Sequence, residues 1–205
     1  MIWPWPWRRT PLAAVRWVAL DCEASGLDPH RDRLLALGAV AVREERVELA
    51  ESFRALLRQE RPSEPANILV HGIGGEAQLG GLPPAETLEA FRAFLGDGVP
   101  VAFHAAFDAA LLRRALGRRL PRRWLDLAAL APALYPERAV VCRALDDWLA
   151  AFDIAPQARH DALGDAFAAA QLLLVLLAAA RRQGVTTLEG VLAAARDRRW
   201  LAPGR

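Results

Sequence analysis

The stretch from Ala166 to Ala180 is the strongest constraint on the fold, because its fifteen residues contain a single polar side chain, Gln171. A helix that is apolar on every side has to be covered on every side, so this stretch predicts a buried core helix. It is shorter than the about 20 residues that cross a bilayer, and Asp165 and Arg181 flank it. We therefore expect a core helix over about 163–183 and no membrane span.

Short apolar runs bounded by turn residues predict five strands, at 16–21, 33–42, 49–57, 99–103 and 124–127. Between and after them, helical patterns are expected at 84–95, 107–116, 127–134, 143–152 and 187–199, and a short apolar element at 66–73. Strands come first and then alternate with helices. This order indicates an α/β fold with a mixed five-stranded sheet flanked by helices.

Length and composition describe an ordinary globular chain of 205 residues, 54% apolar and 24% charged. No linker or repeat divides it, so one domain is expected over 16–200, between an N-terminal arm at 1–15 and a tail at 201–205. Two cysteines, Cys22 and Cys142, are too few for a disulfide scaffold. With no secretory leader before them, a cytoplasmic location is expected.

The N-terminal arm alternates Trp3, Trp5 and Trp7 with prolines, which forbid a helix and favour an extended segment. Three exposed indoles would form an apolar patch that soluble monomers seldom tolerate. We expect the arm to pack on protein, within the chain, across a homodimer or on a partner protein. The alternative is that the indoles stack on single-stranded bases.

The formal charge of +2 decides little, but all 26 basic residues are arginine. Six of them cluster between residues 113 and 123: Arg113, Arg114, Arg118, Arg119, Arg122 and Arg123. This cluster fits a path for a phosphate backbone, since the guanidinium fork matches phosphate oxygens, and it equally fits a solvated surface.

Asp21 and Glu23 stand two residues apart at the end of the first predicted strand, so both carboxylates project from one face. Two like charges this close are costly to bury without a cation between them. Magnesium and manganese prefer carboxylate oxygens, so the pair suggests a divalent-metal site, although acidic pairs are common at strand ends.

Two further segments carry acids near apolar helices. Asp108 opens the helix that follows His104, and Asp165 lies five residues after His160 at the start of the apolar run. An acid in a first helical turn complements the helix dipole, which is the simpler explanation. An aspartate beside fifteen apolar residues, however, is expensive to bury without a partner.

These motifs together resemble the DEDDh 3′–5′ exonucleases, the family of the DNA polymerase III epsilon subunit, ribonuclease T and oligoribonuclease. The matching motifs are D-x-E with a following small-residue turn (21–27), F-D before an apolar helix (107–108) and H-x-A-L-x-D-A (160–166). The segment V-H-G-I at 70–73 also fits the epsilon-like branch. The resemblance runs from about Arg16 to Gln183 and implies a ribonuclease H-like fold.

The resemblance also implies two divalent ions, Mg²⁺ or Mn²⁺, held by four acids. Asp21 would bridge both ions, Glu23 and Asp165 would bind the first, and Asp108 the second. His160 would act as the general base, a role that suits an imidazole near neutral pH.

Nucleotide contacts are implied for the backbone of Ala24, Ser25, Gly26 and Leu27, with Leu27 as a wedge between the last two bases. His71 is expected either at the same nucleotide or in a loop, where it would be packed or exposed to solvent. Where the family has asparagine, this chain has His104, which either replaces that hydrogen bond or is a core histidine.

The sequence therefore predicts a metal-dependent 3′–5′ exonuclease that acts on single-stranded 3′ ends, with DNA as the expected substrate, and releases nucleoside 5′-monophosphates. The alternatives are an exoribonuclease or short-oligonucleotide hydrolase of the same family, and a non-catalytic nucleic-acid-binding module. Retention of all four acids and of His160 argues against the last.

Overall fold

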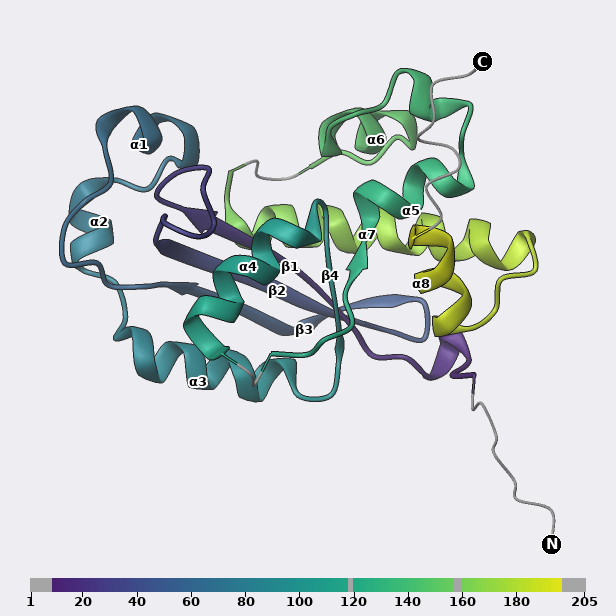
Figure 1. Cartoon of the computed structure of the whole chain (residues 1–205), viewed down its shortest axis with the longest axis horizontal. Helices are drawn as coiled ribbons and strands as arrows, with labels where there is room; N and C mark the ends of the chain where they lie inside the picture. Colours follow the sequence, from purple (N-terminus) through teal and green to yellow (C-terminus); the bar gives the residue numbers. More distant parts are fainter. Residues whose placement is uncertain (1–8, 118–119, 157–159, 197–205) are drawn as a thin grey trace, which may run out of the picture.

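A computed structural model describes residues 9–117, 120–156 and 160–196 as a mixed five-stranded sheet with helices on both faces (Figure 1). The spatial order of the strands is β3-β2-β1-β4-β5. Strands β1 (Trp17–Ala24), β2 (Leu34–Arg43) and β3 (Arg46–Leu56) form an antiparallel meander. Strands β4 (Val99–Ala102) and β5 (Leu125–Asp126) run parallel to β1. The predicted fold class is confirmed.

Eight α-helices lie among the described residues, and seven of them correspond to predicted elements. Helix α2 (Gly75–Leu79) was not predicted, because its five residues begin at the third of three closely spaced glycines and show no helical period. The others are α1 (Pro65–His71), α3 (Pro84–Leu95), α4 (Ala105–Leu116), α5 (Leu127–Leu134), α6 (Leu145–Ala151), α7 (Ala162–Arg182) and α8 (Leu188–Arg196). Thr187 caps the last helix, since its Oγ1 accepts a hydrogen bond from the Gly190 N–H at 3.2 Å.

The alternation of β1 divides the interior into two apolar clusters. Trp17 and Ala19 face the side covered by α5, α6, α7 and α8, whereas Val18, Leu20 and Cys22 face α3 and α4. Figure 1 shows α3 and α4 lying in front of the sheet and α7 running behind it. At the carboxyl end of β1, side chains on one face therefore point toward α7 and its neighbours, and side chains on the other face point toward α3 and α4.

Helix α7 is the predicted core helix. It is long and apolar enough to span a membrane, but 12 of its 21 residues are buried and it packs against β1 and β2. The helix begins at Asp161, whose carboxylate caps it by accepting a hydrogen bond from the Gly164 N–H at 3.0 Å. Because the middle of α7 is apolar and buried, only the polar residues at its ends can belong to a catalytic site.

Gly38 allows α7 to touch the sheet. A Cβ at this position of β2 would lie 2.1 Å from Ala162 C and Leu163 N, the backbone of the first turn of α7. Gly38 pairs with Asp21 across β1 and β2. The absence of a side chain thus lets the start of α7 approach the sheet beside the first predicted acid.

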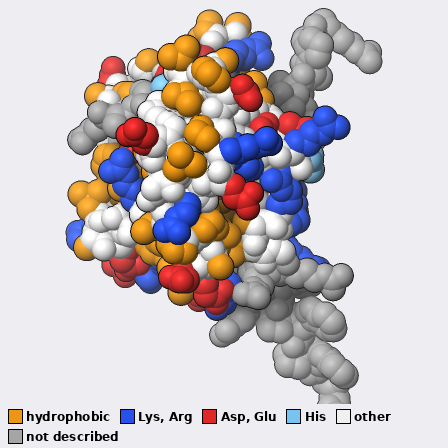
Figure 2. Space-filling model, turned by 90° about the vertical axis from the view of Figure 1, so that its left-hand side faces the viewer, with side chains coloured by type: hydrophobic (Ala, Val, Ile, Leu, Met, Phe, Trp, Pro, Cys, Tyr) orange, Lys and Arg blue, Asp and Glu red, His pale blue; other side chains and the backbone are white. Residues whose placement is uncertain are grey.

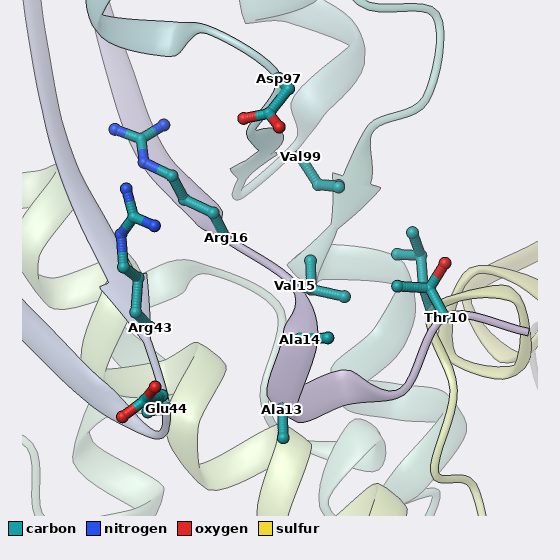
Figure 3. A pocket seen from close by; sticks show the side chains of 10 residues that line it. Thr10, Ala13, Ala14, Val15, Arg16, Arg43, Glu44, Asp97 and Val99 are labelled. Carbon is teal, nitrogen blue, oxygen red and sulfur yellow. The ribbon is translucent and has the colours of Figure 1, made fainter.

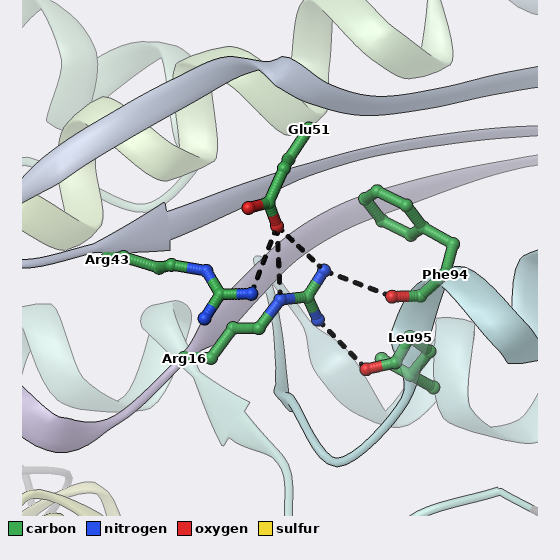
Figure 4. A network of polar contacts seen from close by, with 5 residues as sticks. All are labelled: Arg16, Arg43, Glu51, Phe94 and Leu95. Atoms are coloured by element: carbon green, nitrogen blue, oxygen red, sulfur yellow. Dashed lines mark hydrogen bonds and ion pairs between the residues drawn. The ribbon is translucent and has the colours of Figure 1, made fainter.

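The opposite end of the sheet is held by an arginine network (Figure 4). Glu51 accepts hydrogen bonds from Arg16 and Arg43, and Arg16 also donates to the carbonyls of Phe94 and Leu95 at the end of α3. The register between β2 and β3 shifts from Val40↔Ser52 to Ala41↔Glu48, so Glu51 lies in a bulge of β3. Desolvation opposes its charge, but Arg43 and Arg16 together lower the pKa of Glu51.

The N-terminal segment belongs partly to the domain body. Leu12 and Val15 are buried, and backbone hydrogen bonds join Leu12 to Thr186 and Leu188 to Thr10. The predicted arm at 1–15 is therefore too long, because its last residues pack against the start of α8. Trp3, Trp5 and Trp7, and the tail at 201–205, lie outside the described residues.

We predict that Gly38→Ala destabilises the protein by roughly 1–3 kcal/mol, the usual cost of overpacking. The added methyl group meets backbone atoms of α7 that cannot rotate away. Urea denaturation with and without EDTA measures the effect. Gly74→Ala is the matched control, because its Cβ would have no atom within 4 Å and its φ is −59°. Equal stability of the two variants would contradict the close approach of α7.

Candidate active site

Three of the four predicted metal ligands converge at the carboxyl end of β1. Asp21 and Glu23 come from the strand, and Asp165 comes from the first turn of α7. One ligand oxygen from each lies within 4.8 Å of the other two. The side-chain alternation of β1 directs the first two acids toward α7, and Gly38 lets the third reach them.

Asp165 is oriented by the backbone of the predicted general base. The His160 N–H donates a hydrogen bond to Asp165 Oδ2 at 3.1 Å. His160 adopts a left-handed conformation with φ +59°, which is uncommon outside glycine and turns the chain into the helix. The positive end of the α7 dipole also favours a carboxylate at this position.

Asp108 approaches the end of β1 from the other face of the sheet. It lies in the first turn of α4, is buried, and accepts hydrogen bonds from the thiol and the backbone N–H of Cys22. Desolvation raises the pKa of Asp108 to about 7. The thiol is in turn affected, since burial and the carboxylates of Asp108 and Asp21 raise the pKa of Cys22. Cys22 thus links Asp108 to the strand that carries Asp21 and Glu23.

His160 lies at the rim of a pocket of about 210 Å³ that Glu23 also lines. The side chain of His160 is exposed. The pocket is also lined by the apolar residue Ile73 and by the charged residues Arg54 and Asp161. Asp161 is the N-cap of α7 and the ion-pair partner of Arg54, and these two contacts hold the turn after His160 in place.

The loop between β1 and β2 is tied together from inside. Ser25 Oγ donates to Asp32 Oδ1 at 2.9 Å and accepts from the Arg33 N–H, so this hydroxyl serves the loop itself. A Cβ at Gly26 would lie 2.5 Å from the Asp32 carboxylate, so a larger residue here would displace this carboxylate from Ser25. Ala24 ends β1, and Leu27 projects from the loop with 91% of its surface exposed. The loop that follows β1 thus presents an unburied apolar side chain, and the wedge role of Leu27 stays a prediction.

His104 takes the position where the resembling family has asparagine. It is exposed, has φ +62° and precedes α4, and its N–H donates to Asp126 Oδ1 at 3.0 Å. Asparagine and histidine are both enriched in this left-handed conformation, so either residue suits the backbone at position 104. The core alternative for His104 is wrong. Asp126, which also caps α5 through the Ala128 N–H, was not predicted and gives no motif signal in the sequence.

His71 lies in the interior rather than at a nucleotide. It is 3% exposed, Ser63 Oγ lies 3.0 Å from its Nε2, and the Ile73 N–H donates to its Nδ1. Both ring nitrogens are therefore engaged, and desolvation lowers the pKa of His71. The structure favours the packed alternative and corrects the expected nucleotide contact of this side chain.

The predicted arginine path is partly a set of loop anchors. Arg114 donates to the carbonyls of Pro29 and Asp32, which fixes the loop that carries Leu27. Arg123 forms an ion pair with Glu189 of α8 at 3.5 Å. Arg118 and Arg119 lie outside the described residues.

A second pocket, of about 480 Å³, is larger but lies at the far end of β1 (Figure 3). Arg16, Arg43, Glu44 and Asp97 line it among small apolar residues, and Figure 3 shows the two guanidinium groups side by side. Since Glu51 already pairs with both arginines, this pocket offers little unsatisfied charge. The convergence of acids makes the smaller pocket the better candidate for catalysis.

The donor set fits a divalent metal ion. Oxygen ligands from Asp21, Glu23 and Asp165 suit a hard cation such as Mg²⁺ or Mn²⁺, and the convergence of three carboxylates is unfavourable without one.

Figure 2 looks onto the end of the molecule that carries the β1–β2 loop, α1 and α2. Basic, acidic and hydrophobic side chains are mixed over it, among the exposed apolar residues Leu27, Leu69 and Val70.

Comparison with known proteins gives a consistent result. The family model described as "Exonuclease" (RNase_T) matches residues 18–173. A DNA polymerase III subunit epsilon-like protein of Rhodobacter capsulatus is 34% identical over 190 residues, which cover 89% of this chain and 27% of that protein. The DNA polymerase III PolC-type of Thermotoga maritima is 30% identical over 83% of this chain and 12% of its own length.

Among solved structures, E. coli exonuclease I in complex with a dT13 oligonucleotide has a TM-score of 0.71 at 18% identity. The match covers 83% of this chain and 42% of that chain, and it shows a shared fold. The chain thus spans less than half the length of each of these similar proteins.

In the metal-free protein, Asp108→Asn should increase stability more at pH 8 than at pH 4. The folded state keeps a proton on Asp108 up to about pH 7, whereas the unfolded chain releases it near pH 3.8. The wild type therefore loses stability as the pH rises from about 4 to 7, and the amide does not. We expect a gain of roughly 1–3 kcal/mol at pH 8 and little at pH 4.

Urea denaturation in EDTA measures this gain. The control is Asp153→Asn, which changes an exposed carboxylate outside the cluster and should show no comparable pH dependence. A gain at pH 8 no larger than that at pH 4 would mean that Asp108 is ionised in the folded protein.

Proposed function

Because the chain belongs to the exonuclease family whose model it matches, we propose that it is a metal-dependent 3′–5′ exonuclease that hydrolyses single-stranded ends. The observation that carries the proposal is the convergence of Asp21, Glu23 and Asp165 within 4.8 Å beside the exposed imidazole of His160. The proposed products are nucleoside 5′-monophosphates.

The four acids are proposed to hold two divalent ions. Asp21, Glu23 and Asp165 would hold one ion, and Asp21 with Asp108 would hold the other. When bound, such a pair of ions neutralises the charge that develops on the attacking and leaving oxygens of an in-line displacement. The protein itself holds the four carboxylates, which come from both faces of the sheet, at the carboxyl end of β1. These groups then need to move little during the reaction.

His160 is proposed to take the proton from the attacking water. Its ring is exposed at the rim of the pocket that Glu23 lines, so it can reach a water molecule in front of the acids. Its backbone is fixed by the hydrogen bond to Asp165, which keeps base and ligand in one unit. Proton transfer by a positioned imidazole typically contributes 10²–10⁴-fold to the rate.

The substrate is proposed to be a single strand of DNA. Leu27 stands free on a loop that Ser25, Asp32 and Arg114 hold, and such a side chain can enter between two bases only if the strand is unpaired. E. coli exonuclease I, which shares the fold, is described in complex with dT13. A preference for RNA is the alternative, since contacts to the 2′-OH decide it.

The test is degradation of matched DNA and RNA strands that are labelled at either end, with and without Mg²⁺. We expect ladders that shorten from the 3′ end, faster on DNA, and no cleavage in EDTA. Asp165→Asn should reduce kcat by at least about 100-fold, as the loss of a metal ligand predicts. Asp153→Asn is the control and should cleave like the wild type.

Shortening from the 5′ end would overturn the direction. Cleavage by folded Asp165→Asn at the rate of the wild type would overturn the metal site. Faster cleavage of RNA would favour the exoribonuclease alternative. Binding of strands without any cleavage in Mg²⁺ or Mn²⁺ would favour a non-catalytic module.

His160→Ala should reduce kcat by about 10²–10⁴-fold, the contribution of a general base. Binding of Mn²⁺ should persist, because the variant keeps all four carboxylates and the backbone N–H that contacts Asp165. Single-turnover rates and calorimetry with Mn²⁺ separate the two effects. His30→Ala is the control, since His30 is exposed in the β1–β2 loop. If both variants keep the rate of the wild type, another group takes the proton.

A further inference from the structure

The start of α7 is seated on three residues that form a row across the sheet. Asp21 pairs with Gly38, and Gly38 pairs with Arg54 of β3. Partners in adjacent strands share a face, so Asp21 and Arg54 project toward α7 on either side of the glycine. One side of the helix start therefore meets an acid of the metal cluster, and the other side meets a guanidinium group.

Arg54 makes a specific contact with the helix cap. Its NH2 group lies 2.6 Å from Asp161 Oδ1, while Asp161 Oδ2 accepts the hydrogen bond from the Gly164 N–H. Both oxygens of this carboxylate are thus engaged, one with the strand and one with the helix. The pair is partly exposed, with 69% of the Arg54 side chain and 31% of the Asp161 side chain accessible, so its role is to fix geometry rather than to add stability.

Asp161 connects this contact to the proposed general base, His160, and to the proposed metal ligand Asp165. His160 is the preceding residue, and its strained φ of +59° depends on how the chain enters the cap. The N–H of His160 donates in turn to Asp165 Oδ2. A displacement of Asp161 would therefore move the imidazole and turn the carboxylate of a metal ligand.

We propose that Arg54 is a positioning residue that sets the geometry of His160 and Asp165 through Asp161. The inference rests on the proposed function for the roles of those two residues. The contact links β3 to the metal cluster without touching the reacting atoms. Loss of outer contacts of this kind typically costs 10–100-fold in metal affinity or activity.

Arg54 also lines the pocket that contains Glu23 and His160, so direct contact with a substrate phosphate is the competing role. The two roles differ in what they change. A positioning residue lowers kcat and metal affinity and leaves KM for the strand nearly unchanged, whereas a phosphate contact raises KM. A positioning contact also needs Asp161, and a phosphate contact does not.

The experiment compares Arg54→Met, Asp161→Asn and the double variant. Asparagine keeps the helix cap but removes the charge partner. We expect each single variant to lose about tenfold in kcat with KM unchanged, and the double variant to lose no more than either. Arg54→Lys should recover most of the activity, since lysine restores the charge.

The matched control is Arg181→Met. Arg181 pairs with Glu45 at 2.5 Å and so joins the other end of the same helix to the β2–β3 turn. If Arg54 only helps α7 to dock on the sheet, the two methionine variants will lose similar stability and similar activity. If it positions the site, Arg181→Met will cleave like the wild type.

Calorimetry with Mn²⁺ alone gives a readout that does not depend on cleavage. We expect Arg54→Met to bind Mn²⁺ about tenfold more weakly than the wild type and Arg181→Met to bind it equally well. A raised KM with unchanged kcat and Mn²⁺ affinity, additive losses in the double variant, or equal behaviour of Arg54→Met and wild type would each overturn the proposal. Mn²⁺ binding by a wild type that never cleaves would instead overturn the proposed function.

Discussion

The contact between the backbone of β2 at Gly38 and the first turn of α7 is the constraint on which the site depends. Ala162 and Leu163 lie so close to this strand that any side chain at position 38 would collide with them. Helix and sheet packed through side chains stand about 10 Å apart. The approach at Gly38 is what brings Asp165, three residues further along, within reach of Asp21 and Glu23. The long apolar body of α7 then anchors this start by burying its middle.

The electrostatic cost of the site is divided between the two faces of the sheet. Asp165 arrives from α7 on one face and Asp108 from α4 on the other, and each occupies a first helical turn where the dipole favours a negative charge. Asp108 is the more deeply buried, so its pKa rises to about 7, while hydrogen bonds from Cys22 partly compensate. A fold optimised for stability alone would not keep these carboxylates together, and their retention is typical of functional sites.

The sheet and the long helix could be predicted from periodicity and the pair Asp21 and Glu23 from its spacing, whereas Asp165 was joined to this pair only through the family resemblance. It missed α2, whose stability comes from Gln78 and Ser63 rather than from a helical pattern. The role of Asp161 was also missed, and the sequence could not choose between the alternatives for His71, since their partners Arg54 and Ser63 are set by how distant segments meet. Gly38 gave no signal, because a glycine inside a strand pattern does not reveal what approaches it.

Arginine is the only strongly basic residue type in the chain, and the fold uses several arginines to fix loops. Arg114 holds the β1–β2 loop through two carbonyls, Arg33 holds the loop before α1 through the carbonyls of Arg61 and Pro62, and Arg54 holds the entry to α7. The planar guanidinium group suits this role, because one side chain can bind two acceptors in fixed directions. Two of these segments adjoin the acids, because the β1–β2 loop follows Glu23 and the entry to α7 precedes Asp165. The guanidinium group, which could bind the phosphates of a substrate, here binds backbone carbonyls and a carboxylate and fixes the rim of the site. The number of arginines in a stretch of sequence therefore does not distinguish a phosphate-binding cluster from a set of loop anchors.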